Sequence, residues 1–198
     1  MIRISVDAWF KTIFQLLGTN TLSATFLVAA IIGGIITYVR RKEISTLKMN
    51  YFGYMLLESS LYALLIGTLI GLFLDSLLNM QAESPLYQLT KLQLIALSLG
   101  AGLYEELFFR VILVGLLLFI FKKIFDSHIT AYMIAVIIAA LIFSTVHYIG
   151  EFGDVFTLNS FLFRFLFGLV LNVVYVKRGF GIAAWTHAIY DLLVISFM

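Results

Sequence analysis

The 198-residue sequence has no cysteine, a single proline and few charged residues. Without cysteine, the chain cannot form disulfides, use a thiolate nucleophile, or bind zinc or an iron–sulfur centre through sulfur. Only 12% of its residues are charged, against about 25% in ordinary globular chains. The net charge of +2 is small and the basic residues form no stripe, so nothing indicates a nucleic-acid partner.

Hydrophobic residues make up 62% of the chain, and its mean hydropathy is +1.05. This composition predicts an all-α, polytopic membrane helix bundle that forms one membrane-embedded domain over residues 1–198, with the lipid bilayer as its surroundings. About 20 apolar residues cross the hydrocarbon core, and six segments are long enough. They are Leu22–Val39, Tyr51–Leu74, Leu92–Phe121, Ile129–Val146, Leu158–Val176 and Gly181–Met198.

The N-terminal segment, residues 1–20, differs from these spans because it is amphipathic at helical spacing. Its apolar side carries Val6, Trp9, Phe10, Ile13, Phe14 and Leu17, and its polar side carries Asp7, Lys11 and Gln15. We expect it to form an interfacial helix that lies on the membrane surface.

Basic residues gather in alternate loops between the predicted spans. Eight lie on one side of the membrane (Arg40, Arg41, Lys42, Lys48, Lys122, Lys123, Lys177 and Arg178), and three lie on the other (Arg3, Lys11 and Lys91). The positive-inside rule places the eight in the cytoplasm and both termini outside. A chain this short is typical of a bacterial plasma-membrane protein.

The third predicted span carries three charges in an otherwise apolar run, namely Glu105, Glu106 and Arg110. Charges at membrane depth are costly, and they are usually paired or functional. Glu106 and Arg110 are separated by one helical turn and can form an ion pair. Glu105 lies about 100° away around an α-helix, so we expect it to be the carboxylate available for chemistry.

Two histidines also fall at or within predicted spans, each with a partner four residues away. Phe143 precedes His147, and His187 precedes Asp191, so each pair shares a helix face. A carboxylate among apolar walls can take a proton from water, and two imidazoles can stabilise an oxyanion or hold a metal. Asp191 would orient His187. Together these groups predict a water-activating hydrolase site that needs no serine or cysteine nucleophile.

Three other polar groups are expected to take no part in the reaction. His128 falls in a short polar loop, where it is expected to be solvated. Arg164 and Asn172, in the fifth predicted span, are expected to face the bundle or an interface rather than the reaction.

The order Glu-Glu-x-x-x-Arg, Phe-x-x-x-His and His-x-x-x-Asp on three membrane helices resembles the CPBP family, and the resemblance covers about residues 90–195. This family comprises CAAX-prenyl-protease-type and bacteriocin-processing, self-immunity intramembrane proteases. The resemblance implies an endopeptidase that cleaves a peptide or membrane-protein substrate. It implies Glu105 as the base, and His147 and His187 as the groups that position water or stabilise the oxyanion. Glu106 and Arg110 would shape the site.

The third motif in that family often ends in asparagine, whereas this chain has Asp191. A carboxylate donates no hydrogen bond to an oxyanion unless it is protonated, so the sequence favours an orienting role for Asp191. We expect no metal cofactor. The alternative is a zinc ion held by Glu105, His147 and His187, but that arrangement would need a second base.

Two other functions remain as alternatives. One is a non-catalytic bacteriocin immunity protein or membrane scaffold of the same fold, and the other is a small transporter with an intramembrane proton relay. The costly intramembrane groups argue against a pure binding protein. The absence of an inverted repeat argues against a transporter. The sequence does not define the substrate or the oligomeric state.

One geometric feature of the predicted site is unfavourable. His147 lies at the end of the fourth predicted span and His187 near the start of the sixth, although both spans run in the same direction. At 1.5 Å per residue their depths differ by roughly 18 Å. The site can form only if the sixth helix starts deep in the membrane, if the fourth helix is displaced toward the cytoplasm, or if the helix boundaries differ from those predicted here.

Overall fold

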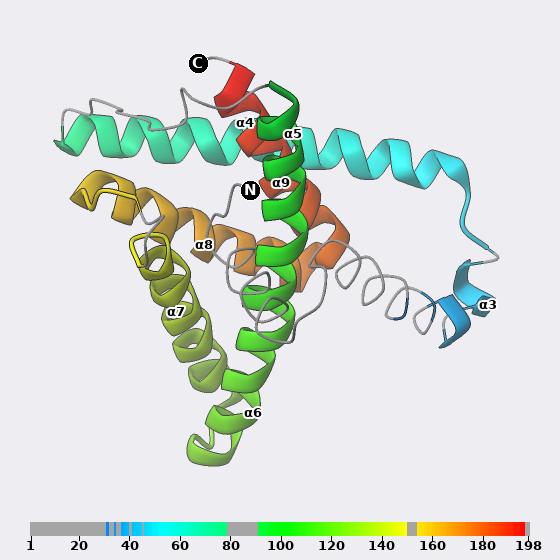
Figure 1. Cartoon of the computed structure of the whole chain (residues 1–198). Coiled ribbons are helices and arrows are strands. Elements are labelled where there is room, and N and C mark those ends of the chain that lie inside the picture. The colour runs from blue at the N-terminus through cyan, green and yellow to red at the C-terminus, as the bar shows by residue number, and fades with distance from the viewer. Residues whose placement is uncertain are drawn as a thin grey trace, which may run out of the picture.

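A computed structural model describes residues 31, 34, 37–39, 41–44, 46–78, 91–149 and 154–196 (Figure 1). Within these ranges the chain is helical and contains no strand. The elements are α3 (Arg41–Ile44), α4 (Met49–Leu78), α5 (Lys91–Gly100), η2 (Ala101–Glu105), η3 (Leu107–Leu113), α6 (Val114–Ile124), α7 (His128–Val146), α8 (Leu158–Arg178) and α9 (Phe180–Ser196). The prediction of an all-helical chain is confirmed.

Three of these helices are long and apolar enough to cross a membrane, over Met49–Ser76, His128–Val146 and Leu158–Arg178. They correspond to the second, fourth and fifth predicted spans. α9 corresponds to the sixth predicted span and is a shorter apolar helix. The predicted interfacial helix in residues 1–20 and most of the first predicted span lie outside the described residues.

The third predicted span is helical without interruption from Lys91 to Ile124, but its middle is not α-helix. The π-helical segments η2 and η3 lie on either side of Glu106. A π-helix closes i→i+5 hydrogen bonds in place of i→i+4 bonds, and it occurs mostly as single-turn bulges, frequently at functional sites. Here the two π-helical segments occupy the region that carries the three charges.

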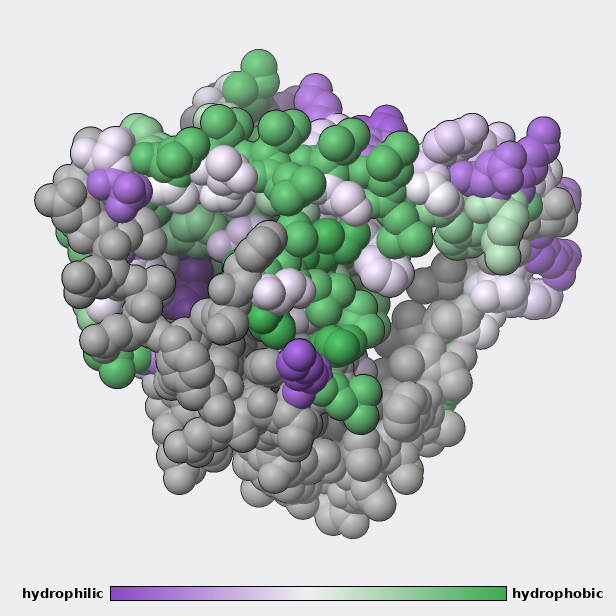
Figure 2. All heavy atoms as spheres, turned by 90° about the horizontal axis from the view of Figure 1, so that it is seen from above, coloured by the Kyte–Doolittle hydropathy of each residue, from purple (hydrophilic) through white to green (hydrophobic). Residues whose placement is uncertain are grey.

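Apolar side chains are exposed along the outer faces of the helices. Figure 2 shows them over most of the described part of one face, where hydrophilic residues form separate small groups. On α4 the exposed residues include Leu57, Leu61, Leu65 and Leu69. Soluble monomers rarely expose apolar patches of this extent. A lipid environment accounts for this surface, and the chain is an integral membrane protein.

The helices pack around α9 at one end of the bundle and around α7 at the other. α9 contacts α4, α5, η2 and α8, whereas α7 packs between α6 and α8 (Figure 1). Helix starts are capped, because Ser127 accepts a hydrogen bond from the Thr130 N–H and Thr157 accepts one from the Ser160 N–H. Such caps satisfy backbone donors that the first helical turn leaves free.

The turn between α8 and α9 explains how the last helix reaches the site. Gly179 has φ +90°, a backbone region that favours glycine, and it connects the two helices directly. Ser59, several turns into α4, donates a hydrogen bond to the Ile182 carbonyl oxygen at 3.3 Å. α9 therefore begins alongside the interior of α4 instead of level with its end.

Small residues allow η2 and α9 to approach closely. A Cβ added to Gly102 would lie 2.5 Å from the Ala184 carbonyl oxygen and 2.7 Å from the Ala188 Cβ. Close approach through glycine and alanine is a common way for membrane helices to associate, because van der Waals packing drives their contact. This contact places the end of η2 beside the middle of α9.

We expect Gly102→Ala to lower the free energy of unfolding by about 1–3 kcal/mol, because the added methyl group forces the two backbones apart. Thermal unfolding in detergent measures the change. The control is Gly115→Ala in α6, where an added Cβ meets nothing within 4 Å. That variant is expected to be neutral or stabilised by up to about 1 kcal/mol. Equal stabilities of the two variants would contradict the close contact.

Candidate active site

Three separate segments bring the predicted site residues together at the centre of the bundle. The η2–η3 segment supplies Glu105, Glu106 and Arg110, the end of α7 supplies His147, and the middle of α9 supplies His187 and Asp191. Glu105, Glu106 and Arg110 are only 3%, 0% and 0% exposed. Burial of three ionisable groups is tolerated only where they are paired, so their contacts define the site.

Glu106 contacts two partners through its two carboxylate oxygens. Its Oε2 lies 2.9 Å from Arg110 Nε, which is the ion pair predicted from the i,i+4 spacing. Its Oε1 lies 2.9 Å from His187 Nδ1 on α9, a contact that the sequence did not predict. Glu106 therefore links the charge of Arg110 to the orientation of an imidazole on another helix.

Asp191 lies farther from His187 than Glu106 does. Its Oδ2 is 3.8 Å from His187 Nε2, which is beyond a direct hydrogen bond. The i,i+4 spacing correctly places the two side chains on one helix face, but the packing of η2 on α9 gives His187 a nearer carboxylate. The residue that holds the ring of His187 is thus Glu106 instead of Asp191.

Glu105 faces the second histidine. Its Oε2 lies 3.7 Å from His147 Nε2. The other ring nitrogen, Nδ1, lies 2.8 Å from the Phe143 carbonyl oxygen, one turn earlier on α7. Because a carbonyl oxygen only accepts, Nδ1 carries the proton and donates it, and in neutral His147 the lone pair of Nε2 is directed toward Glu105. Nε2 of His147 and Oε2 of Glu105, which lie 3.7 Å apart, are then both hydrogen-bond acceptors.

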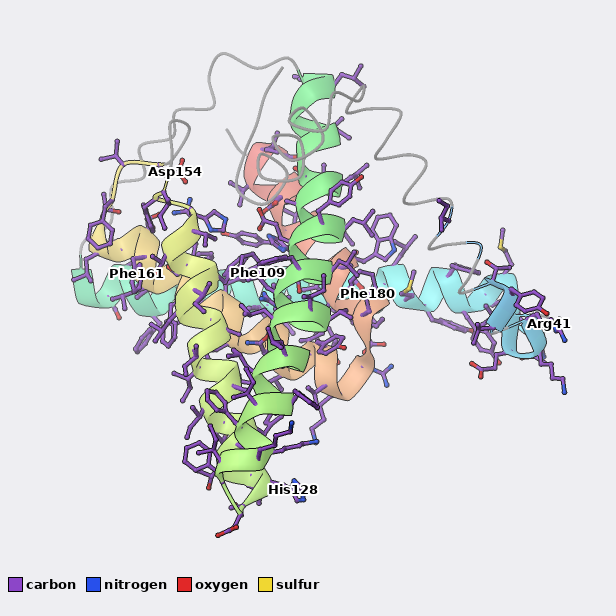
Figure 3. All side chains as sticks on the ribbon, turned by 60° about the horizontal axis from the view of Figure 1, so that its bottom comes forward. Arg41, Phe109, His128, Asp154, Phe161 and Phe180 are labelled. Carbon is purple, nitrogen blue, oxygen red and sulfur yellow. The ribbon has the colours of Figure 1, made fainter. Side chains whose placement is uncertain are left out.

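The ring of Phe143 lies between these two pairs. Its centroid is 5.0 Å from the His147 ring, 5.9 Å from the His187 ring and 5.0 Å from the Phe109 ring. The Arg110 guanidinium lies 4.8 Å from the same centroid. Because both imidazole rings contact the Phe143 ring, the distance between the two imidazole centroids cannot exceed the sum of their distances to the Phe143 centroid. They belong to one site, which Phe109 and Phe143 line with apolar surface; Figure 3 labels Phe109 near the crossing of the helices.

Phe143 contacts the rings of both histidines, whereas the sequence predicted only that it faces His147. The available signal was its i,i+4 spacing to His147, since this spacing places the ring against the imidazole. Arg164 was also assigned away from the reaction. In the structure it binds the residue that follows His147, through a hydrogen bond from Nη1 to the Tyr148 hydroxyl at 2.7 Å. The sequence feature that indicates a role for Arg164 is its charge inside an apolar segment.

The site does not include His128, Glu58 or Asn172. His128 is exposed at the start of α7, at the far end of that helix from His147 (Figure 3). Glu58 on α4 pairs with Arg178 at the end of α8. Asn172 donates a hydrogen bond to the Val136 carbonyl oxygen and so joins α8 to α7. The predictions for His128 and Asn172 agree with these positions.

A metal ion would need three or more ligands brought to one point. Among the described residues, no group of three His, Cys, Asp or Glu side chains is arranged to hold one. The hydrogen bonds at Nδ1 of His187 and His147 leave Nε2 of each ring as the nitrogen that could bind a metal, as is common for histidine ligands. However, the ligands of the alternative zinc arrangement (Glu105, His147 and His187) are not assembled around one point in the observed side-chain positions.

Comparison with protein families gives a match over the part of the chain that carries the site. Residues 87–193, slightly more than half of the chain, match a family described as type II CAAX prenyl endopeptidase Rce1-like. This range contains all six predicted site residues. No curated protein and no solved structure gives a significant match.

Proposed function

Because this chain belongs to the Rce1-like family of type II CAAX prenyl endopeptidases, we propose that it hydrolyses a peptide bond within the membrane with a water molecule activated by Glu105. The observation that carries the proposal is the position of Glu105 opposite His147, beside the Glu106–His187 pair. Family membership supplies the reaction class. The geometry supplies a role for each group.

The mechanism begins with a water molecule that donates one hydrogen to Glu105 and the other to Nε2 of His147. This water satisfies both acceptors across the 3.7 Å separation. Glu105 takes a proton as the water oxygen attacks the carbonyl carbon of the peptide, and a tetrahedral oxyanion forms. His147 keeps the water in place because its own ring is fixed by the Phe143 carbonyl oxygen.

His187 stabilises the oxyanion in the proposed mechanism. With Nδ1 bound to Glu106 and Asp191 near Nε2, an imidazolium at this position is flanked by two carboxylates. Its Nε2–H then donates to the oxyanion, an interaction that is strong where water is excluded. As the intermediate collapses, Glu105 returns its proton to the leaving nitrogen and the carbon–nitrogen bond breaks. The products are a carboxylate and an amine.

The proposal is tested by comparing cells that express the wild type with cells that express Glu105→Gln. Mass spectrometry of membrane-derived peptides, at equal protein levels, is expected to find peptides that disappear in the variant. The cleavage sites shared by those peptides identify the substrate. The matched control is Glu58→Gln, which removes a carboxylate paired with Arg178 outside the site and is expected to leave the peptides unchanged.

The same experiment separates the endopeptidase from its alternatives. A non-catalytic immunity or scaffold protein predicts identical peptides in wild type and Glu105→Gln, together with a phenotype that survives the substitution. The family match favours the endopeptidase over both of these functions. A transporter predicts a flux across proteoliposomes that depends on Glu105 without any cleavage. Peptides that do not change in several growth conditions would overturn the proposed function.

We further propose that the reaction requires no metal ion, since Glu105, His147 and His187 each have a role without one. Activity of the purified protein is expected to stay within twofold of its initial value after treatment with a strong chelator. A loss of activity that zinc restores would contradict this expectation. The control is a zinc protease treated in parallel, whose activity the chelator must remove.

The proposed location is a bacterial plasma membrane, with the basic loops in the cytoplasm. Lys122 and Lys123 at the end of α6, and Lys177 and Arg178 at the end of α8, are exposed where these helices end. Cationic side chains at cytoplasmic helix ends agree with the positive-inside rule. The proposed substrate is a peptide or the tail of a membrane protein that enters the bundle from the lipid or from either surface.

A further inference from the structure

Arg164, in the second turn of α8, binds three different segments with one guanidinium group. Its Nη1 donates to the Tyr148 hydroxyl at 2.7 Å and to Ser160 Oγ at 2.6 Å. Its Nη2 forms an ion pair with Asp154. Tyr148 follows α7, Asp154 precedes α8, and Ser160 is in the first turn of α8. A planar group with five fixed donors can serve three acceptors at once, which an ammonium group cannot do in the same geometry.

These contacts reach the backbone of His147. α7 ends at Val146, so His147 lies just beyond the last helical residue, where backbone carbonyls lack helical partners. The Asp154 N–H satisfies the His147 carbonyl oxygen at 2.9 Å. Arg164 therefore binds the side chain of the residue that caps His147, and also the side chain of Tyr148, the residue next to His147. Figure 3 labels Asp154 beside this end of α7.

Arg164 is also close to the site itself. Its guanidinium lies 5.2 Å from the centroid of the Tyr148 ring, which in turn packs against Phe156. The cluster of Arg164, Asp154 and Tyr148 thus forms one wall at the His147 end of the candidate site.

We propose that Arg164 is a positioning residue for the hydrolysis, because it fixes the end of α7 and so holds the His147 imidazole at its distance from Glu105. This inference rests on the proposed function, in which His147 keeps the attacking water in place. A histidine that lies beyond the end of its helix depends on tertiary contacts for its position. Misplacement of a catalytic group by about 1 Å can cost about 100-fold in rate.

The same helix offers a matched control for Arg164. Arg178, at the other end of α8, pairs with Glu58 at 2.5 Å and has no contact with the site. Removal of either arginine breaks an arginine–carboxylate pair that joins α8 to another segment. A role limited to stability predicts similar effects of the two substitutions on activity, whereas a positioning role predicts an effect of Arg164 alone.

The test measures cleavage of a quenched fluorescent, farnesylated CAAX peptide by the purified full-length protein in detergent, with the unprenylated peptide in parallel. If neither peptide is cleaved, a peptide identified by the mass spectrometry described above replaces them. We expect Arg164→Met to lower kcat by about 10- to 100-fold with KM within about threefold. Arg178→Met is expected to keep kcat within twofold. Arg164→Lys, which keeps the charge without the three-way contact, is expected to recover only part of the loss.

Equal kcat values for Arg164→Met and Arg178→Met would overturn the inference, as would full activity of Arg164→Lys. Should Arg164→Met fail to fold, Asp154→Asn removes the charge of one partner and Tyr148→Phe removes the hydroxyl of another, and each variant is expected to lower kcat about 3- to 10-fold. Wild-type kcat in both of these variants would also overturn the inference that Arg164 is a positioning residue. Glu105→Gln separates the two proposals: cleavage that survives this substitution overturns the proposed function, whereas loss of cleavage in Glu105→Gln together with wild-type kcat in Arg164→Met overturns only the role of Arg164.

A spectroscopic measurement tests the position of His147 without any substrate. The chain has three histidines, so ¹⁵N-histidine spectra can be assigned with His128→Gln and His147→Gln. Arg164→Met and Asp154→Asn are expected to shift or broaden the His147 ring signals and to leave the His187 signals in place. Arg178→Met is expected to change neither. Unchanged His147 signals in Arg164→Met would contradict the inference even if the enzyme's substrate were still unknown.

Discussion

Glu105→Gln is expected to lower kcat by about 10³-fold or more while KM stays within about threefold. Glutamine has nearly the same shape as glutamate, but its amide cannot take a proton from water, and loss of a general base typically costs 10²–10⁴ in rate. Glu105 is 3% exposed and faces Nε2 of His147. Binding of the peptide does not depend on the base, so the loss is confined to kcat. Steady-state cleavage of the probe peptide by purified protein measures both constants.

The control for this experiment is Glu58→Gln, which is expected to keep kcat within twofold. Glu58 also lies in an apolar helix, but it is bound to Arg178 and has no contact with the site residues. Equal unfolding temperatures of the two variants would show that any difference in rate has a chemical origin. If Glu105→Gln kept more than a tenth of wild-type kcat, another group would have to activate the water.

Local spacing allowed part of the site to be predicted from the sequence. Residues four apart on a helix face one another, so the Glu106–Arg110 pair and the contact between Phe143 and His147 follow directly from their positions. The same rule correctly places Asp191 beside His187, although not within hydrogen-bonding distance. Each of these relations lies within a single helix, where backbone geometry alone determines which side chains are neighbours.

The contact between Glu106 and His187 could not be predicted in this way, because 81 residues separate them. It depends on how closely η2 and α9 approach, and that approach depends on the absence of side-chain atoms at Gly102 opposite Ala184. A glycine in an apolar segment has many structural roles. Without the partner helix, the sequence does not show which residue the glycine allows to approach.

The π-helical backbone around the three charges was also beyond prediction. An apolar run of 30 residues predicts a helix but does not distinguish i→i+4 from i→i+5 hydrogen bonds. The extra residue in each π-helical turn changes the direction of every side chain after it. The 100° separation of neighbouring residues in an ideal α-helix therefore does not describe how Glu105 in η2 and Arg110 in η3 are directed. Glu105 and Arg110 lie in one site because of the π-helical backbone and because of the way the helices pack.

The arrangement of the last two helices shows a similar limit. Hydropathy predicted α8 and α9, but not that α9 begins alongside the interior of α4. The hydrogen bond from Ser59 to the Ile182 carbonyl oxygen defines that offset. A serine in an apolar helix indicates a polar contact without identifying the partner. Counting residues from the predicted span ends therefore placed His147 and His187 too far apart.

Substitution of Glu106 is the second change for which we expect a large effect, because this residue contacts both Arg110 and His187. Glu106→Leu leaves the Arg110 guanidinium buried, at 0% exposure, without its carboxylate. Removal of one partner from a buried ion pair typically costs about 3–5 kcal/mol, whereas replacement of both partners by apolar residues is often neutral. We expect Glu106→Leu to lower the free energy of unfolding by about this amount. We expect the double variant Glu106→Leu/Arg110→Met to recover most of it.

Activity is expected to follow a different course from stability in these variants. A carboxylate that holds a catalytic imidazole contributes up to about 10⁴ to kcat in serine proteases, and Glu106 holds His187 through Nδ1 at 2.9 Å. The double variant should therefore be stable and still lose about 10²–10⁴ in kcat. The corresponding double substitution Glu58→Leu/Arg178→Met, in a partly exposed pair, should change neither quantity strongly. Recovery of activity together with stability would mean that Glu106 only balances the charge of Arg110, and that His187 is oriented without it.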